Sequence, residues 1–184
     1  MDEDLREATI AVLRERGWDG LTLERVAEVA GRARSTLWRQ QITRDSLIAG
    51  LLSDLAEDYR KAMYPVLTAP GSGRDRLGLA MDALCDVIDE HLPLLLATDE
   101  AFHQDTAPGQ PAGYLSPFIQ FLREGAVDGS LIIREDVVDQ ADVTWNAVAW
   151  TYTHLRGRHR WDAGRARRLI FDLLMSGLGG EAKE

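Results

Sequence analysis

Four arginines lie close together near the start of the chain, and no carboxylate separates them. They are Arg32, Arg34, Arg39 and Arg44, in a sequence whose formal charge is −9. Guanidinium groups bind phosphates and the edges of bases, often through two hydrogen bonds at once. A locally cationic segment in an acidic chain therefore predicts contact with a polyanion.

Other polar side chains between these arginines extend the same chemistry. Arg and Gln hydrogen-bond to base edges, and Ser and Thr reach either bases or phosphates. A helix over residues 34–40 would turn Leu37 toward a core and leave the remaining side chains outside. This outward set comprises Arg34, Ser35, Thr36, Trp38, Arg39 and Gln40.

A second short helix must precede this one to position it. Apolar residues recur through 23–30 at helical spacing, Thr22 is a suitable N-cap, and Gly31 is a suitable stop. Two helices around a Gly turn predict a helix-turn-helix, whose second helix enters the major groove of DNA. Thr22 and Arg44 stand at helix N-termini, where hydroxyl and guanidinium groups bind phosphates. A solvated, arginine-rich face on an ordinary helical hairpin is the alternative interpretation.

Helical patterns continue along the rest of the chain. No segment alternates as a β-strand does, so the sequence predicts an all-α fold of about nine helices. Pro93 is expected to open a short separate helix at 94–97. The other helices are expected near 5–17, 23–30, 34–40, 43–64, 74–90, 115–128, 137–155 and 163–178.

The composition excludes several classes of protein. The acidic N-terminus is unlike a secretory signal, and no apolar run approaches the roughly 20 residues that span a bilayer. The single Cys85 excludes an internal disulfide framework and fits a reducing compartment. We therefore expect a cytoplasmic protein with no membrane partner.

An enzyme is not expected. Glu100 and His103 have the Glu-x-x-His spacing of di-iron bundles, but those sites need two such motifs. The sequence holds no phosphate-binding Gly-rich loop and no nucleophile elbow. The prediction is no catalytic residue, no metal and no cofactor.

The segment GWDGLTLERVAEVAGRARSTLWRQQITRDSL resembles the N-terminal domain of the TetR family of transcriptional regulators. The matching features span about 45 residues. They are Gly17, Leu21-Thr22, Val26-Ala27, Ala30-Gly31, Thr36-Leu37-Trp38, Arg44-Asp45 and Leu47. This chain differs from the family pattern at Arg32, Ala33 and Gln41, and Gln41 replaces a Phe that commonly packs into the core.

The resemblance implies a DNA-binding domain at 1–47 and an effector-binding and dimerisation domain at 48–184. We expect Arg34, Ser35 and Arg39 to read bases and Thr22, Trp38 and Arg44 to bind the backbone. Thr36 and Gln40 also match DNA-contact positions. The protein would then be a repressor that binds a palindromic operator, is nucleoid-associated when bound, and is released by a small-molecule effector.

The larger domain is expected to supply the effector pocket and the dimer interface. Candidate pocket residues are Leu84, Ile88, Phe102, Tyr114, Phe118 and Trp145. The family forms a four-helix homodimer interface from its last two helices, which implies Val148, Tyr152, Ala166, Leu169, Ile170, Leu173 and Leu174. The alternative function is a helical dimeric interaction module whose DNA binding is weak or lost.

Overall fold

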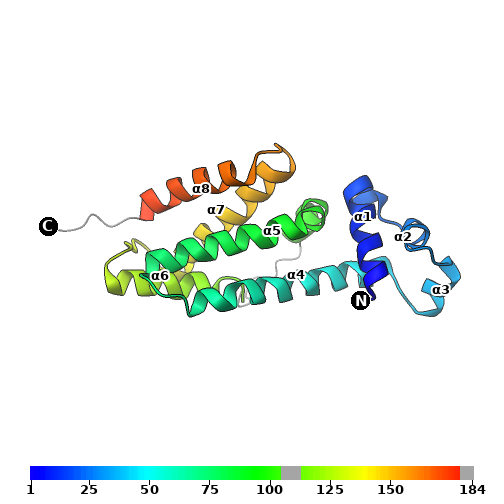
Figure 1. Cartoon of the computed structure of the whole chain (residues 1–184), viewed down its shortest axis with the longest axis horizontal. Helices are drawn as coiled ribbons and strands as arrows, with labels where there is room; N and C mark the ends of the chain where they lie inside the picture. Colours follow the sequence, from blue (N-terminus) through cyan, green and yellow to red (C-terminus); the bar gives the residue numbers. More distant parts are fainter. Residues whose placement is uncertain (105–112, 179–184) are drawn as a thin grey trace. The chain divides into compact units, whose positions relative to one another are not determined.

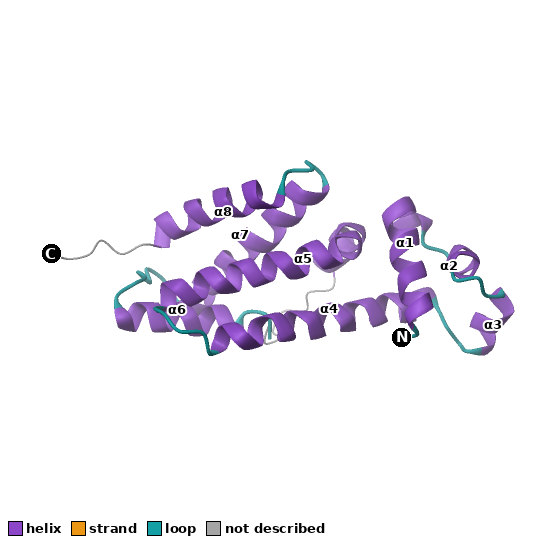
Figure 2. Ribbon diagram, viewed as in Figure 1, coloured by secondary structure: helices purple, strands orange, loops and turns teal. Residues whose placement is uncertain are grey.

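The computed structural model describes residues 1–104 and 113–178, without the side chains of residues 99–104. These residues form eight α-helices and no β-strand, which confirms the predicted all-α fold (Figure 1 and Figure 2). The helices are α1 (Glu3–Gly20), α2 (Leu23–Val29), α3 (Arg34–Arg39), α4 (Arg44–Leu67), α5 (Gly73–Gln104), α6 (Ser116–Asp128), α7 (Val137–Gly157) and α8 (Ala163–Leu178).

The separate helix expected after Pro93 does not exist, and this accounts for the lower number of helices. Pro93 instead lies inside α5, which runs on to Gln104. Proline lacks the N–H that would bond to the carbonyl four residues earlier. A 32-residue helix keeps enough neighbouring hydrogen bonds to continue past this one gap.

The chain divides into two compact units. Unit 1 comprises Met1–Glu57 and His91–Ala107, and unit 2 comprises Asp58–Glu90 and Pro108–Glu184. The divisions fall inside α4 and α5, so each of these helices contributes residues to both units. The predicted domain limits at residues 47 and 48 remain a prediction.

The core of unit 1 positions α2 and α3. Val26 and Leu37 have no exposed surface, and they join a cluster that includes Leu5, Leu51 and Leu94. Helix α1 packs against α2, and α2 packs against α3. Helices of six or seven residues are unstable alone, so this packing must hold α2 and α3 in place.

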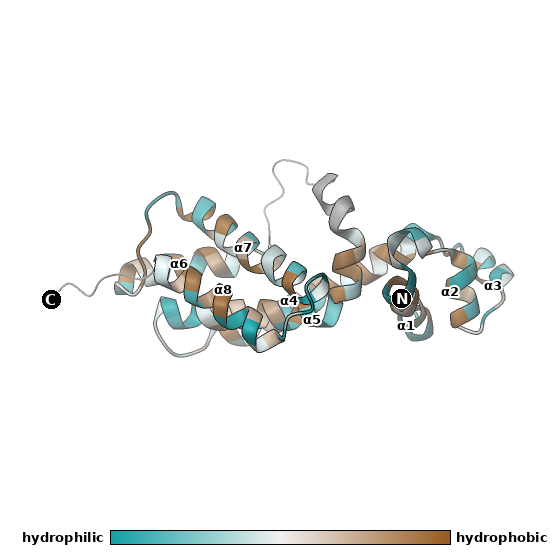
Figure 3. Cartoon of the chain, turned by 90° about the horizontal axis from the view of Figure 1, so that it is seen from above, coloured by the Kyte–Doolittle hydropathy of each residue, from teal (hydrophilic) through white to brown (hydrophobic). Residues whose placement is uncertain are grey.

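Unit 2 is built on the packing of α7 against both α6 and α8. Figure 3 shows apolar and polar residues alternating along these helices, as expected when each buries one face. Phe118, Phe121 and Leu122 are fully buried on α6. Gly73 allows α5 to begin against the α6 backbone, because an added Cβ would lie 2.1 Å from the Gly125 nitrogen.

Candidate DNA-binding surface

Local hydrogen bonds fix both ends of α2. The Thr22 hydroxyl accepts from the Arg25 N–H at 3.4 Å, which confirms Thr22 as the N-cap. Gly31 has φ +63°, and the Arg32 N–H donates to the Ala27 carbonyl at 2.8 Å. This is the glycine-dependent helix stop expected from the sequence. The turn therefore sets where α3 begins.

Helix α3 presents a polar face on one side and Leu37 on the other. Leu37 is fully buried, whereas Trp38 is 80% exposed. We call the exposed set the reading face: Arg34, Ser35, Trp38, Arg39 and Gln40. Thr36 is half-buried beside it. Hydrogen-bonding groups are thus brought together on one short helix, and Leu37 packs the opposite side of that helix against the unit 1 core.

The arginines of the reading face are only weakly held. Arg34 pairs with Glu24 at 2.8 Å, but 70% of its side chain and 53% of that of Glu24 are exposed. Arg39 makes one long hydrogen bond, at 3.5 Å, to the Thr36 hydroxyl. Exposed ion pairs contribute about 1 kcal/mol or less, so a phosphate or a base can displace them.

Arg44 has internal contacts instead. Its guanidinium donates to the Trp18 carbonyl at 2.7 Å and lies 4.2 Å from the centre of the Trp18 ring. Its Nε is buried and has no hydrogen-bond partner in the described part of the chain. Thr43 caps α4 by accepting from the Ser46 N–H at 3.0 Å. Arg44 therefore ties the start of α4 to the end of α1.

Arg32 is bound to the N-terminal residues. Its guanidinium contacts the Asp2 carboxylate at 2.5 Å and the Asp4 carboxylate at 3.0 Å. The hydrogen bond from Arg32 lowers the pKa of Asp2, which is also the N-cap of α1. Sequence reasoning grouped Arg32 with the DNA-binding arginines and missed this contact. The acidic N-terminus was the available signal, but nothing local relates positions 28 and 30 residues apart.

Gln41 does not occupy a core position. Its side chain is exposed and its backbone is left-handed, with φ +55°. The Gln41 N–H donates to the Trp38 carbonyl, and the Ile42 N–H donates to the Leu37 carbonyl, both at 3.0 Å. This pair of bonds is a Schellman motif that ends α3. Ile42, rather than residue 41, packs against the unit 1 core.

The pocket candidates in unit 2 divide into two groups. Leu84, Ile88 and Phe118 are buried core residues. Tyr114 is 37% exposed, and its ring lies 6.1 Å from that of the half-buried Trp145. The Phe102 side chain lies outside the described residues.

Tyr59 joins this aromatic group, a contact that no local sequence pattern indicates. Its hydroxyl donates to the Tyr114 carbonyl at 2.5 Å, and the two rings meet edge to face at 5.0 Å. Burial raises the pKa of Tyr59 above its ordinary value, so the phenol stays protonated even at an alkaline pH where an exposed tyrosine ionises. Tyr59, Tyr114 and Trp145 form the aromatic cluster of unit 2.

The dimer candidates differ in exposure. Leu169 is 47% exposed, Leu173 is 76% exposed, and Leu174 is half-buried. The other four lie in the core of unit 2, namely Val148, Tyr152, Ala166 and Ile170. On α7, two apolar residues are exposed: Val143, with 68% of its surface accessible, and Val138, with 42%.

A polar network missed by sequence reasoning surrounds Asp89. Its carboxylate accepts from the Tyr152 hydroxyl at 2.6 Å, and from Arg156 Nε at 2.7 Å. Arg167 bonds Asp86 at 2.7 Å and Asp89 at 3.3 Å. Hydrogen bonds from Tyr152 and Arg156 outweigh burial and lower the pKa of Asp89. The network joins α5, α7 and α8.

Comparison with known proteins finds solved structures that share this arrangement of helices. No family model matches the sequence, and neither does any curated protein. None of the described helices is long and apolar enough to cross a membrane. Among solved structures, the TetR-family regulator PfmR of Thermus thermophilus aligns with TM-score 0.74 and 17% identity, over 95% of this chain and 98% of its own.

Two further structures align over nearly the whole chain. The regulator FadR of Bacillus subtilis, in complex with stearoyl-CoA, has TM-score 0.73 and 16% identity, covering 96% of this chain and 98% of its own. The ketosteroid regulator KstR2 of Mycobacterium tuberculosis has TM-score 0.66 and 17% identity, covering 97% and 95%. Each similarity is one of fold.

Proposed function

We propose that this chain, which has the fold of the TetR-family transcriptional regulators, is a ligand-responsive DNA-binding regulator. It would act in the cytoplasm as a homodimer that represses transcription from a palindromic operator. The reading face of α3 carries this proposal. Its hydrogen-bonding side chains are exposed, while Leu37 holds the helix on the unit 1 core.

Within the reading face, we assign base contacts to Arg34, Ser35 and Arg39. Both arginines reach solvent and have only weak partners. Binding DNA would therefore break only weak interactions within the protein. Trp38 would pack on the sugar–phosphate backbone, with Thr36 and Gln40 as further polar contacts. Thr22 and Arg44 would act mainly by positioning the helices that carry the contacts. Thr22 caps α2, and Arg44 ties the start of α4 to Trp18.

Selection from a random-sequence duplex library tests the proposal. The wild-type chain should enrich a palindromic sequence, and Arg39→Ala should relax the preference at the bases that Arg39 reads. A bidentate Arg–base contact discriminates by about 1–3 kcal/mol, or roughly 5- to 150-fold in affinity. Arg123→Ala is the matched control, because Arg123 is an exposed arginine on α6. Enrichment of no sequence by the wild-type chain would reject the proposal.

The effector would bind unit 2 at the aromatic cluster of Tyr59, Tyr114 and Trp145. Aromatic walls with a few polar groups are typical of sites for apolar small molecules. Stearoyl-CoA, present in the similar Bacillus subtilis structure, has an apolar acyl chain and is a first probe in a panel of ligands that carry apolar groups. A coupling free energy of about 1–3 kcal/mol would weaken operator binding roughly 5- to 150-fold. Ligand binding that leaves operator affinity unchanged would contradict release by this effector.

A further inference from the structure

A second concentration of arginine occurs in unit 2, far along the sequence from α3. The segment from Arg156 to Arg168 contains six arginines and one acidic residue, Asp162. Residues 51–184 as a whole carry 13 basic and 21 acidic residues. Six of those 13 basic residues therefore lie in the end of α7, the connecting turn and the start of α8.

Two of the six arginines hold the segment in place. Arg156 pairs with Asp89 at 2.7 Å and also donates to the Trp161 carbonyl at 2.5 Å. Arg167 pairs with Asp86 at 2.7 Å. The carboxylate of Asp162 accepts from the Arg165 N–H at 3.0 Å, at the N-terminus of α8. The only acidic group of the segment is thus engaged with the backbone.

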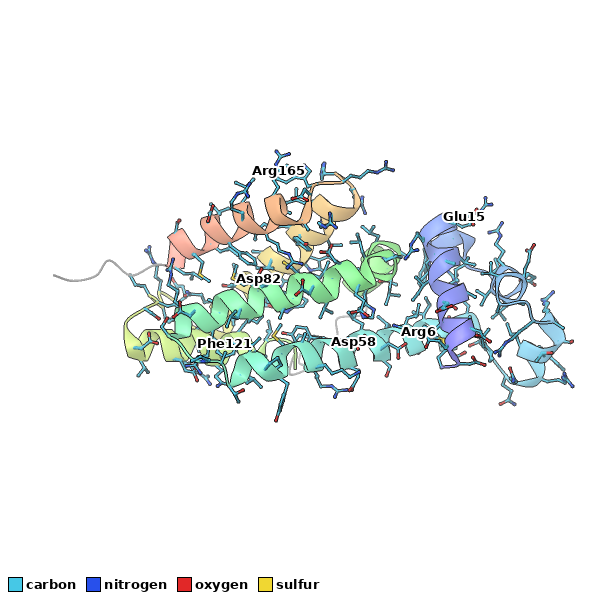
Figure 4. All side chains as sticks on the ribbon, viewed as in Figure 1. Arg6, Glu15, Asp58, Asp82, Phe121 and Arg165 are labelled. Atoms are coloured by element: carbon cyan, nitrogen blue, oxygen red, sulfur yellow. The ribbon has the colours of Figure 1, made fainter. Side chains whose placement is uncertain are left out.

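The remaining four arginines are all exposed, and we call them the arginine turn: Arg158, Arg160, Arg165 and Arg168. Arg160 and Arg168 have no carboxylate partner among the side chains described, those of residues 1–98 and 113–178. The Arg165 guanidinium lies 3.9 Å from the centre of the Trp161 ring, and Figure 4 shows this side chain at the outer edge of α8. Stacking on an indole restricts a guanidinium while leaving its N–H groups available.

The backbone shapes this surface as well. Arg160 has φ +54°, and the Trp161 N–H donates to the Leu155 carbonyl at 2.9 Å. A left-handed residue other than glycine costs about 1–2 kcal/mol, and such residues concentrate at functional sites. The turn joins α7 to α8 at one end of the hairpin they form (Figure 1), and it places Arg158 and Arg160 near the start of α8, where Arg165 and Arg168 lie.

We infer that the arginine turn is a second nucleic-acid contact, which binds the phosphodiester backbone of DNA without reading its sequence. Arginine matches phosphate geometry through paired N–H groups. Four guanidinium groups spread over an exposed turn suit an extended row of phosphates, whereas small ligands bind in concave sites. The inference rests on the proposed function only in its choice of DNA as the polyanion.

Fluorescence anisotropy with a labelled random-sequence duplex of about 40 base pairs tests this contact. The full-length Arg165→Gln/Arg168→Gln variant should bind on the order of tenfold more weakly at low salt. Its slope of log affinity against log salt should fall by about 1.5 to 2, since each lost phosphate contact removes about 0.9. The Arg165→Lys/Arg168→Lys variant keeps both charges and should recover most of the slope.

Arg123→Gln/Arg134→Gln is the matched control, because it removes two exposed arginines elsewhere in unit 2. The inference is overturned if the Arg165/Arg168 variant and this control have the same salt slope as the wild type. It is also overturned if the arginine turn binds only an acidic polypeptide, such as polyglutamate, or if its loss changes only the sedimentation of the protein. Failure of the proposed function is a separate result, in which the wild-type chain selects no sequence.

Discussion

At the scale of single residues, the positions that depart from the family pattern have structural roles of their own. Gln41 ends α3 in a left-handed conformation, and Arg32 is bound to Asp2 and Asp4. Neither residue weakens the core behind the reading face. Arg32 precedes α3 and Gln41 follows it, so the two residues fix the ends of the segment that carries the reading face. Substitutions there should change the stability of the protein more than its base preference.

Gln41→Gly should stabilise the protein. Glycine adopts φ +55° without the steric cost that a side chain has there. The expected gain is up to about 1 kcal/mol in the free energy of unfolding, measured by urea denaturation. Gln40→Gly is the control and should destabilise the protein, because Gln40 has φ −83°. A destabilised Gln41→Gly variant would contradict this account of how α3 ends.

Arg32→Ala should destabilise the protein at pH 7, and the destabilisation should diminish as the pH falls into the acid range. The pKa of Asp2 is lowered in the folded chain by its hydrogen bond from Arg32. A carboxyl group with a lowered pKa contributes its full stability above its unfolded pKa, near 3.9, and that contribution is lost as the pH falls through the lower pKa of the folded state.

Thermal denaturation of the wild type and of Arg32→Ala across this pH range measures the difference. Arg14→Ala is the control, since Arg14 is an exposed arginine of the same unit. A stability difference that is constant from pH 7 to pH 3 would show that Arg32 acts by packing and not through the carboxylates.

At the scale of helices, α7 and α8 bury one face within unit 2 and leave another face outside. Val148 and Ile170 are buried, whereas Val143, Leu169 and Leu173 remain exposed. An exposed apolar stripe on two packed helices is typical of an association surface. We therefore propose that the homodimer forms through this outer stripe, and that the buried candidates support it from within.

Leu173→Arg should shift the protein toward monomer. Two-fold symmetry places a dimer-interface residue in the contact twice, so an introduced charge is buried on both subunits. Sedimentation velocity at micromolar concentration measures the distribution of species. Val127→Arg, on α6, is the control because Val127 is 90% exposed. If the Leu173→Arg variant sediments as the wild type does, the stripe is not the interface.

The sequence predicted most helices because their signals are local. The expected helix at 163–178 matches α8, and the one at 115–128 begins only one residue before α6. The reading face was also predictable, since helical spacing alone separates Leu37 from its polar neighbours. Contacts between distant residues were not predictable. Arg32 with Asp2 and Tyr59 with Tyr114 depend on how the chain folds back, which no local pattern encodes.

At the scale of the whole molecule, α4 and α5 each run through both compact units. Local unfolding of one unit should therefore loosen helices that the other unit needs. Cys85 can report on this, because it is the only cysteine and is fully buried in unit 2. Burial raises its pKa to about 12, so the thiol is unreactive until unit 2 opens.

Leu37→Ala, in unit 1, should accelerate labelling of Cys85 by a thiol reagent. Removing a fully buried leucine costs about 2–5 kcal/mol, which raises the population of open states. The rate is measured by mass spectrometry under native conditions. Val29→Ala is the control, since Val29 on α2 is an apolar residue of unit 1 that is 54% exposed. An unchanged rate in Leu37→Ala would mean that the two units open independently.

The core of unit 1 has a consequence for chimeric proteins made from this chain. Leu51 and Leu94 pack in the same cluster as Val26 and Leu37. A chimera that joins residues 1–47 to a foreign effector domain would leave that cluster without two of its buried leucines. Residues 1–47 should therefore not fold correctly when they are transferred alone to another protein. A working chimera must also inherit, or reconstruct, the segment around Leu94, which the sequence places far from the helices it supports.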